Sequence, residues 1–170
     1  MAIAYIGLGS NLEHPAQHIL QAMHELDNLP HCHLLAVSNT YRSIAVGPGE
    51  QPDYVNAVVQ METSFPPLDL LDAIQSIELA HGRVRDIRWG PRTLDLDMIM
   101  LDNLTMDTER LILPHPRAAE RDFVLRPLLD IVPYLSFPDE RSAAECLASA
   151  DNNGLRVLQT SDDIWQQLRG

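Results

Sequence analysis

The first part of the chain contains one apolar segment with strand periodicity and one segment with helical periodicity. Residues 2–9 are apolar and alternate, which predicts a buried strand that Gly9-Ser10-Asn11 interrupts. Pro15 suits the first turn of a helix that continues to about Leu29. The apolar face of this helix consists of positions at helical spacing, namely Ile19, Leu20, Met23 and Leu26.

The same two periodicities recur as far as residue 101. The further predicted elements are a strand at 33–42, a strand at 56–63, a helix from Pro66-Pro67 to Gly82 and a strand at 93–101. Gly47-Pro48-Gly49 marks a loop, and the polar stretch 83–92 marks another. The resulting β-α-β-β-α-β order is that of a ferredoxin-like α+β fold, with an antiparallel sheet and two helices on one face.

The pattern weakens after residue 102. Ile131-Val132-Pro133 indicates the end of a short helix, and residues 141–170 form a weakly defined C-terminal extension. A chain of 170 residues suits one compact domain, so we expect residues 1–170 to form a single domain.

Several function classes are disfavoured by composition. No apolar stretch reaches the roughly 20 residues that span a bilayer, so no membrane association is expected. The N-terminus lacks the basic region of a signal peptide. The two cysteines, Cys32 and Cys146, lie far apart and predict neither a disulfide framework nor a metal site. We therefore expect a cytoplasmic protein.

The charge distribution points to phosphate chemistry. All 12 basic residues are arginines, which excludes the lysine-dependent Walker A loop. Seven of them fall between positions 83 and 121, whereas the net charge is −12, so no nucleic acid is expected as a partner. A local arginine cluster fits a small polyphosphate, because the guanidinium matches phosphate oxygens. The alternative is a group of surface arginines that fall together by chance.

The strongest local feature is the segment from Arg88 to Asp97, Arg-Trp-Gly-Pro-Arg-Thr-Leu-Asp-Leu-Asp. In a strand, alternation places Leu94, Leu96, Met98 and Met100 on one face and Asp95, Asp97 and Ile99 on the other. Two carboxylates about 7 Å apart on one face suit a hard divalent cation such as Mg²⁺, shared with substrate phosphates. The alternative is the solvent-exposed face of an ordinary strand.

The surroundings of the aspartates favour the metal site. Asp is depleted in strands, so two of them in an apolar strand need a reason. Acidic groups for a metal beside arginines for phosphate are typical of phosphoryl transfer, where a protein mainly positions groups and neutralises charge. Trp89 is either a core anchor or a ring that stacks on a flat heterocycle.

The chain resembles the 6-hydroxymethyl-7,8-dihydropterin pyrophosphokinase family over about residues 3–138. The resemblance is strongest from Arg88 to Leu101. It also includes Gly9-Ser10-Asn11-Leu12, Gly47-Pro48, Gln51 to Asn56, Ile77-Glu78-Leu79, Gly82 to Arg85, Glu109-Arg110-Leu111, Pro114-His115-Pro116 and Arg121 to Val124. It implies transfer of pyrophosphate from ATP to the hydroxymethyl group of the pterin, with release of AMP, in folate biosynthesis.

The resemblance also implies residue roles. The catalytic residues would be Arg83, Arg85, Arg92, Asp95 and Asp97, with the two aspartates holding two Mg²⁺ ions that bridge the phosphates of the co-substrate ATP. The ATP-binding residues would be Glu78, Arg88, Arg110, His115 and Arg121. The pterin-binding residues would be Ser43, Val46, Tyr54, Asn56, Trp89 and Phe123. No general base stands out, so metal-assisted positioning of the alcohol would suffice. We expect a monomer.

Alternatives remain for single residues and for the whole chain. Taken alone, Glu78 is a solvated helix residue, His115 a turn residue, and Tyr54 and Phe123 core residues. Ser43-Ile44 and Ile112 depart from the Thr-Pro and Thr that the family often has. A nucleotidyl transferase would use Gly9-Ser10 with the aspartates, although about 85 residues separate the two motifs. A ligand-sensing module is the non-enzymatic alternative.

Overall fold

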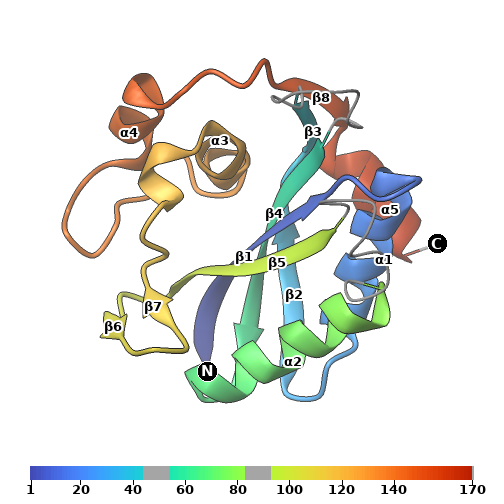
Figure 1. Cartoon of the computed structure of the whole chain (residues 1–170), viewed down its shortest axis with the longest axis horizontal. Coiled ribbons are helices and arrows are strands. Elements are labelled where there is room, and N and C mark those ends of the chain that lie inside the picture. Colours follow the sequence, from blue (N-terminus) through green and yellow to red (C-terminus); the bar gives the residue numbers. More distant parts are fainter. Residues whose placement is uncertain (44–53, 83–92, 170) are drawn as a thin grey trace.

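The structure is a computed structural model, and it describes residues 1–43, 54–82 and 93–169. The helices and strands are β1 (Ala2–Ser10), α1 (Pro15–Asp27), β2 (Cys32–Val37), β3 (Thr40–Ser43), β4 (Tyr54–Thr63), α2 (Pro67–Ala80), β5 (Leu94–Leu101), β6 (Met106–Asp107), β7 (Ile112–Leu113), the 3₁₀ turn η2 (Ala118–Glu120), α3 (Asp122–Ile131), α4 (Ala143–Ser149), β8 (Arg156–Gln159) and α5 (Ser161–Arg169). Figure 1 labels the helices and strands and shows the helices around a central sheet.

The described strands form a six-stranded antiparallel sheet and a separate β6–β7 hairpin. The order of the large sheet is β5-β1-β4-β3-β8, and β2 pairs with the other end of β4. The predicted ferredoxin-like α+β arrangement is therefore confirmed, and β1 and β4 form its centre. The predicted strand at 33–42 is divided into β2 and β3, because Ser38 and Asn39 interrupt it. The Ser38 hydroxyl accepts a hydrogen bond from the Val58 N–H at 2.9 Å.

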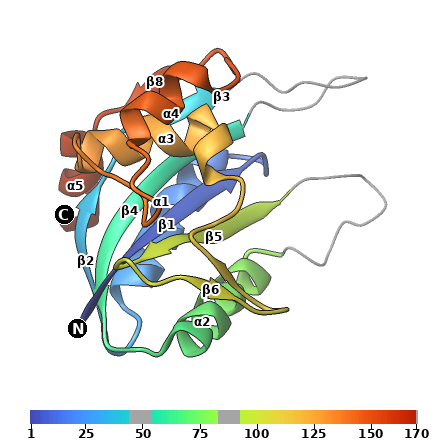
Figure 2. The same ribbon diagram turned by 90° about the vertical axis from the view of Figure 1, so that its left-hand side faces the viewer.

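Each face of the sheet has its own hydrophobic core. On one face α1, α2 and α5 pack on the strands, with fully buried side chains such as Ile19, Leu70 and Ile164. On the other face α3 and α4 contribute Leu125, Leu128 and Ala143. The two views in Figures 1 and 2 show the helices on opposite sides of the sheet. The predicted pair of helices on one face is confirmed; α5 joins α1 and α2 on that face, and α3 and α4 cover the other.

A bulge in β5 overturns one detail of the predicted strand. Tyr5 of β1 pairs with Met100, whereas the next residue, Ile6, pairs with Met98, so Ile99 is an extra residue. A bulge reverses the alternation beyond it. Met98 therefore packs on the α1–α2 side, and Met100 packs on the α3 side rather than with Met98 as predicted.

We expect the α3 side of the core to be sensitive to loss of volume. Leu128 is fully buried between α3 and the sheet. Leu128→Ala should lower the free energy of unfolding by about 3 kcal/mol, because it removes buried methyl groups and leaves a cavity. Urea denaturation measures this change. The matched control is Tyr134→Ala, at a side chain that is 95% exposed. Equal midpoints for the two variants would contradict the assignment of Leu128 to the core.

Candidate functional site

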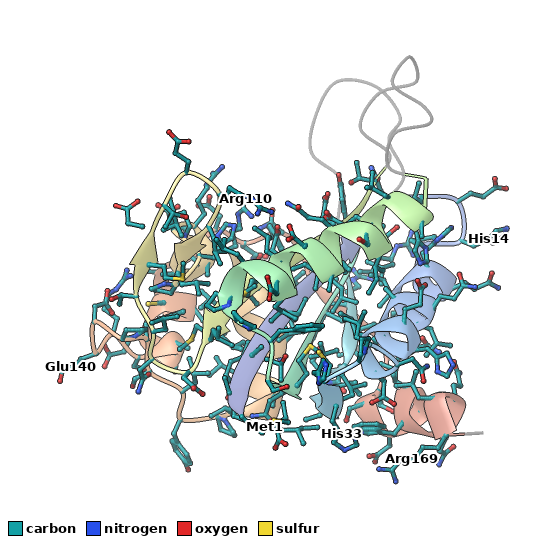
Figure 3. All side chains as sticks on the ribbon, turned by 90° about the horizontal axis from the view of Figure 1, so that it is seen from below. Met1, His14, His33, Arg110, Glu140 and Arg169 are labelled. Atoms are coloured by element: carbon teal, nitrogen blue, oxygen red, sulfur yellow. The ribbon has the colours of Figure 1, made fainter. Side chains whose placement is uncertain are left out.

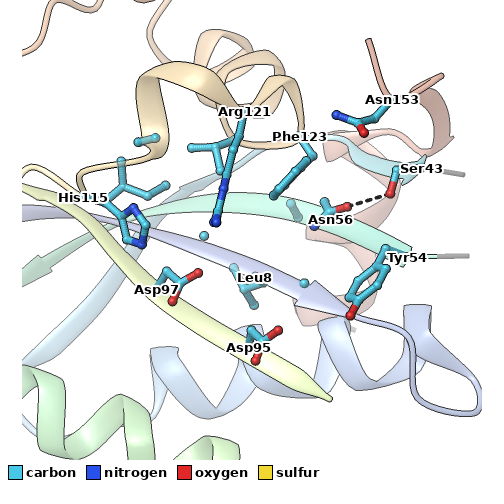
Figure 4. Close-up of a pocket in the computed structure, with 16 residues that line it drawn as sticks. Leu8, Ser43, Tyr54, Asn56, Asp95, Asp97, His115, Arg121, Phe123 and Asn153 are labelled. Carbon is cyan, nitrogen blue, oxygen red and sulfur yellow. Dashed lines mark hydrogen bonds between the residues drawn. The ribbon is translucent and has the colours of Figure 1, made fainter. Parts of the chain in front are cut away.

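The floor of a cavity is formed by three neighbouring strands on the α3 side of the sheet. Gly9 of β1 pairs with Asp95 of β5 on one side and with Asn56 of β4 on the other, and Gly7 pairs with Asp97. Side chains alternate along strands, so both carboxylates, Asn56 and the two glycines share one face. The cavity above this floor has a volume of about 310 Å³. Figure 4 shows both aspartates pointing into it.

Hydrogen bonds at the sheet edge hold the first aspartate in place. The Thr93 hydroxyl donates to Asp95 Oδ2 at 2.9 Å. The Thr93 N–H donates to the side-chain oxygen of Asn11 at 2.9 Å, and the Asn11 N–H donates to the Thr93 carbonyl at 3.2 Å. Asn11 is 1% exposed, so this reciprocal pair ties the start of β5 to the end of β1. The orientation of Asp95 is therefore fixed by its own strand and its neighbour.

The bulge at Ile99 brings a histidine to the second aspartate. The His115 N–H donates to the Ile99 carbonyl at 2.9 Å, so the segment after β7 is attached to the bulge. Burial lowers the pKa of the His115 imidazole; the Asp97 carboxylate opposes this shift, and the Arg121 and Arg117 guanidinium groups add to it. The result is an imidazole beside Asp97 that favours the neutral form, which can accept or donate a hydrogen bond.

The walls of the cavity come from β3, β4 and the start of α3. The Ser43 hydroxyl donates to Asn56 Oδ1 at 3.3 Å, which orients the buried amide. Arg121 lies with its guanidinium carbon 5.5 Å from the centre of the Phe123 ring, and Figure 4 shows its side chain between His115 and Phe123, directed at the aspartates. Burial raises the pKa of the Tyr54 hydroxyl; a hydrogen bond with Thr93 opposes this, and the Asp95 carboxylate adds to it. Tyr54 is thus a neutral phenol.

A second cavity lies beside the first one and shares two lining residues with it. It has a volume of about 350 Å³, and Asp97 and His115 line both cavities. Glu78 lines the second cavity; it is 4% exposed, and its carboxylate accepts the Leu96 N–H at 2.8 Å. Arg110 lines this cavity too and pairs with Asp72 of α2; Figure 3 shows it at the molecule's periphery next to that helix.

The structure brings together most of the predicted site residues that it describes. The predicted pterin residues Ser43, Tyr54, Asn56 and Phe123 line the first cavity, together with Asp95 and Asp97. The predicted ATP residues Glu78, Arg110 and His115 line the second, whereas Arg121 lines the first. Six predicted residues lie outside the described residues, namely Val46, Arg83, Arg85, Arg88, Trp89 and Arg92.

The two departures from the family pattern have different surroundings. Ser43 retains a hydroxyl, which contacts Asn56, and Ile44 lies outside the described residues. Ile112 is 42% exposed and lines the second cavity, where it presents an apolar side chain.

Sequence reasoning did not single out several residues that build the site. Gly7 leaves room for the cavity, Thr93 orients Asp95, and Asn153 of the C-terminal extension lines the first cavity. Strand alternation could have placed Gly7 on the floor, because it is two residues from Gly9. Asn153 follows no periodic pattern, and its place becomes evident only in three dimensions.

The aspartate pair has the properties that a Mg²⁺ site needs. Mg²⁺ is usually held by one or two carboxylates together with substrate phosphates and water. Asp95 and Asp97 provide hard oxygen ligands on one face of a rigid strand, and the two cavities leave room beside them for further oxygen ligands. The residues present therefore fit such an ion.

The chain is similar to known proteins over most of its length. The model of the 7,8-dihydro-6-hydroxymethylpterin-pyrophosphokinase (HPPK) family matches residues 5–133. Two relatives are named 2-amino-4-hydroxy-6-hydroxymethyldihydropteridine pyrophosphokinase. The protein from Pseudomonas aeruginosa is 47% identical, and the match covers 91% of this chain and 95% of that protein. The protein from Haemophilus influenzae is 45% identical, and the match covers 92% of this chain and 99% of that protein.

Solved structures support the fold. A Plasmodium falciparum HPPK-DHPS structure with pterin and p-hydroxybenzoate matches 86% of this chain with a TM-score of 0.66 at 14% identity. Another HPPK-DHPS structure in complex with substrates matches 87% with a TM-score of 0.68 at 13% identity. The chain spans 42% of each of those longer chains. From the family match and the relatives together, the chain belongs to the 7,8-dihydro-6-hydroxymethylpterin-pyrophosphokinase family.

Proposed function

We propose that this protein transfers pyrophosphate from ATP to the hydroxymethyl group of 6-hydroxymethyl-7,8-dihydropterin and releases AMP, a step of folate biosynthesis. The observation that carries the proposal is the junction of two cavities at Asp97 and His115. Two substrates bound in adjoining cavities would meet at Asp97 and His115, next to Asp95, which is the arrangement that a transfer between them requires.

The first cavity suits the pterin. Tyr54 and Phe123 come from different walls, and Figure 4 shows Asn56 between them on the floor. Two aromatic walls suit a flat heterocycle. The Asn56 amide can donate and accept, which matches the alternating hydrogen-bonding groups of a pterin edge.

The second cavity suits ATP. His115 and Arg110 line it and can donate hydrogen bonds, whereas Glu78 supports the sheet beside it. Asp95 and Asp97 would hold two Mg²⁺ ions, which when bound neutralise the phosphate charge. The pterin hydroxyl oxygen would form a bond to the β-phosphorus, the bond from that phosphorus to the α-phosphate oxygen would break, and the alcohol proton would pass to solvent.

The roles of the remaining residues are proposed from the family resemblance. Arg83, Arg85 and Arg92 would contact the transferring phosphates, Arg88 would contact ATP, and Trp89 and Val46 would contact the pterin. We also propose a cytoplasmic monomer that binds no nucleic acid, in line with the net charge of −12. None of the helices in the described part of the chain has the length and apolar character to cross a membrane.

Product analysis tests the proposed reaction. Purified protein with ATP and Mg²⁺ should release AMP only when 6-hydroxymethyl-7,8-dihydropterin is present, and the pterin diphosphate should appear in equal amount. Folded protein without pterin-dependent AMP would overturn the proposal. Release of pyrophosphate instead would identify a nucleotidyl transferase.

We expect a methyl group at Gly9 to interfere with the pterin cavity. A Cβ atom at this position would lie 2.9 Å from Asn56 Nδ2, closer than real contacts allow, so Gly9→Ala must displace the amide. The KM for the pterin should rise by about tenfold, which corresponds to the loss of at least one hydrogen bond to the pterin.

Gly7→Ala provides the matched control for this prediction. Its Cβ would meet the end of the flexible Ile99 side chain at 3.3 Å, which can shift. Steady-state kinetics with varied pterin should therefore give a smaller rise in KM for Gly7→Ala. The reverse order would contradict the role given to Asn56.

A further inference from the structure

The C-terminal extension contributes a side chain to the first cavity. Asn153 lines this cavity, about 30 residues beyond the start of α3. The chain around it is fixed on both sides, because Asp151 before it forms a β-bridge with Arg121 and β8 after it pairs with β3. Asn153 therefore belongs to an ordered wall that also includes Ser43 of β3.

A buried carboxylate holds Asn153 in one orientation. The Asn153 N–H donates to Asp122 Oδ2 at 2.9 Å, and its Nδ2 donates to Asp122 Oδ1 at 2.6 Å. Asp122 is 6% exposed and lies between Arg121 and Phe123, two residues of the same cavity. A carboxylate accepts but does not donate, so the amide nitrogen must face Asp122 and the amide oxygen must face away from it.

The orientation of Asn153 leaves an acceptor at the end of the cavity where Asn56 lies. Figure 4 shows Asn153 beside Phe123 and above Ser43, on the same side of the cavity as Asn56. The exocyclic amino group of a pterin has two N–H donors, and the two diverge in the ring plane. The Asn56 oxygen already accepts a hydrogen bond from the Ser43 hydroxyl, so it can accept a hydrogen bond from only one of these two N–H groups.

We infer that the Asn153 amide oxygen accepts a hydrogen bond from the exocyclic amino group of the pterin. Asp122 is then a positioning residue, because it fixes the amide without contacting the pterin. This inference rests on the proposed function. It assigns part of the substrate specificity to the C-terminal extension.

Binding of the pterin to Asn153→Ala tests the inference. Titration calorimetry with Mg²⁺ and a non-hydrolysable ATP analogue should show a pterin dissociation constant raised about five- to tenfold, as for loss of one hydrogen bond. The dissociation constant of the ATP analogue should not change. A pterin analogue without the exocyclic amino group should bind wild type and Asn153→Ala equally, because the variant then has no hydrogen bond to lose.

Two further variants separate contact from loop structure. Asn152→Ala removes the hydrogen bond from the Gly154 N–H to Asn152 Oδ1, 2.8 Å long, and thus loosens the same turn, yet it should keep wild-type pterin affinity. Asp122→Asn keeps the shape of the positioning residue and lets the Asn153 amide rotate, so it should weaken pterin binding without affecting the ATP analogue.

The outcomes are distinct for the two proposals. The role of Asn153 is overturned if Asn153→Ala binds the pterin with wild-type affinity. It is also overturned if the variant loses equal affinity for the pterin and for the analogue without the amino group. In both cases AMP formation by the wild-type protein still supports the proposed function. A wild-type protein that binds no pterin and forms no AMP overturns the proposed function and this inference with it.

Discussion

Replacement of Asp97 by alanine should reduce pterin-dependent AMP formation by about a thousandfold, the scale on which loss of a preorganised electrostatic group lowers kcat. Asp97 lines both cavities, so its carboxylate lies where the two substrates would meet. Without it, Asp95 alone would have to hold the cations that offset the phosphate charge. AMP formation at saturating ATP and pterin, with Mg²⁺ in excess, measures the effect.

The control for Asp97→Ala is Asp107→Ala. Asp107 is an exposed acid of β6 that lines neither cavity, so its loss changes the net charge equally and should leave kcat within about twofold. Asp97→Asn keeps the side-chain volume and should be nearly as impaired as the alanine variant, which would attribute the effect to charge. A loss of less than tenfold in Asp97→Ala would show that this carboxylate does not hold the reacting groups.

Local patterning predicted the part of the fold whose helices and strands have a strong periodicity of their own. The order of four strands and two helices followed from periodicity, since β1, β4 and β5 each bury a regular face. The division of the second strand was not predictable, because it depends on the Ser38 hydroxyl reaching the Val58 N–H across the sheet. The bulge at Ile99 was not predictable either, because an extra residue in an apolar strand does not alter its composition.

The C-terminal extension was unpredictable for a different reason. Residues 141–170 contain short elements with little periodicity of their own. β8 exists because it extends the sheet beside β3, and α5 because Ile164 enters the core next to α1. These are contacts between residues more than 100 positions apart, which no local pattern reports.

The site was predicted as far as charge and alternation allow. The placement of Asp95 and Asp97 on one face of a strand is confirmed by the register of β5 with β1. The link between His115 and that face required the bulge, whose Ile99 carbonyl accepts the His115 N–H. The position of Arg121 in the first cavity required the packing of α3 against the sheet, which the sequence did not specify.

The location of Arg121 leads to the second prediction. A residue assigned only to ATP would change the KM for ATP, whereas Arg121 lies in the cavity proposed for the pterin and is directed at the aspartates in Figure 4. From there its guanidinium can reach the phosphate that moves between the substrates. Arg121→Ala should therefore lower kcat by about a hundredfold, as when one donor to a developing charge is removed.

Two variants make the Arg121 prediction specific. Arg121→Lys keeps the charge but not the planar fork, so it should recover only part of the activity. Arg117→Ala removes a neighbouring arginine that is 67% exposed and pairs with Glu120, and its kcat should stay near that of wild type. Steady-state kinetics with each substrate varied in turn would decide the question. A higher KM for ATP with unchanged kcat in Arg121→Ala would show that this residue acts in ATP binding. Equal kcat values for Arg121→Ala and Arg117→Ala would show that Arg121 does not act in the transfer step.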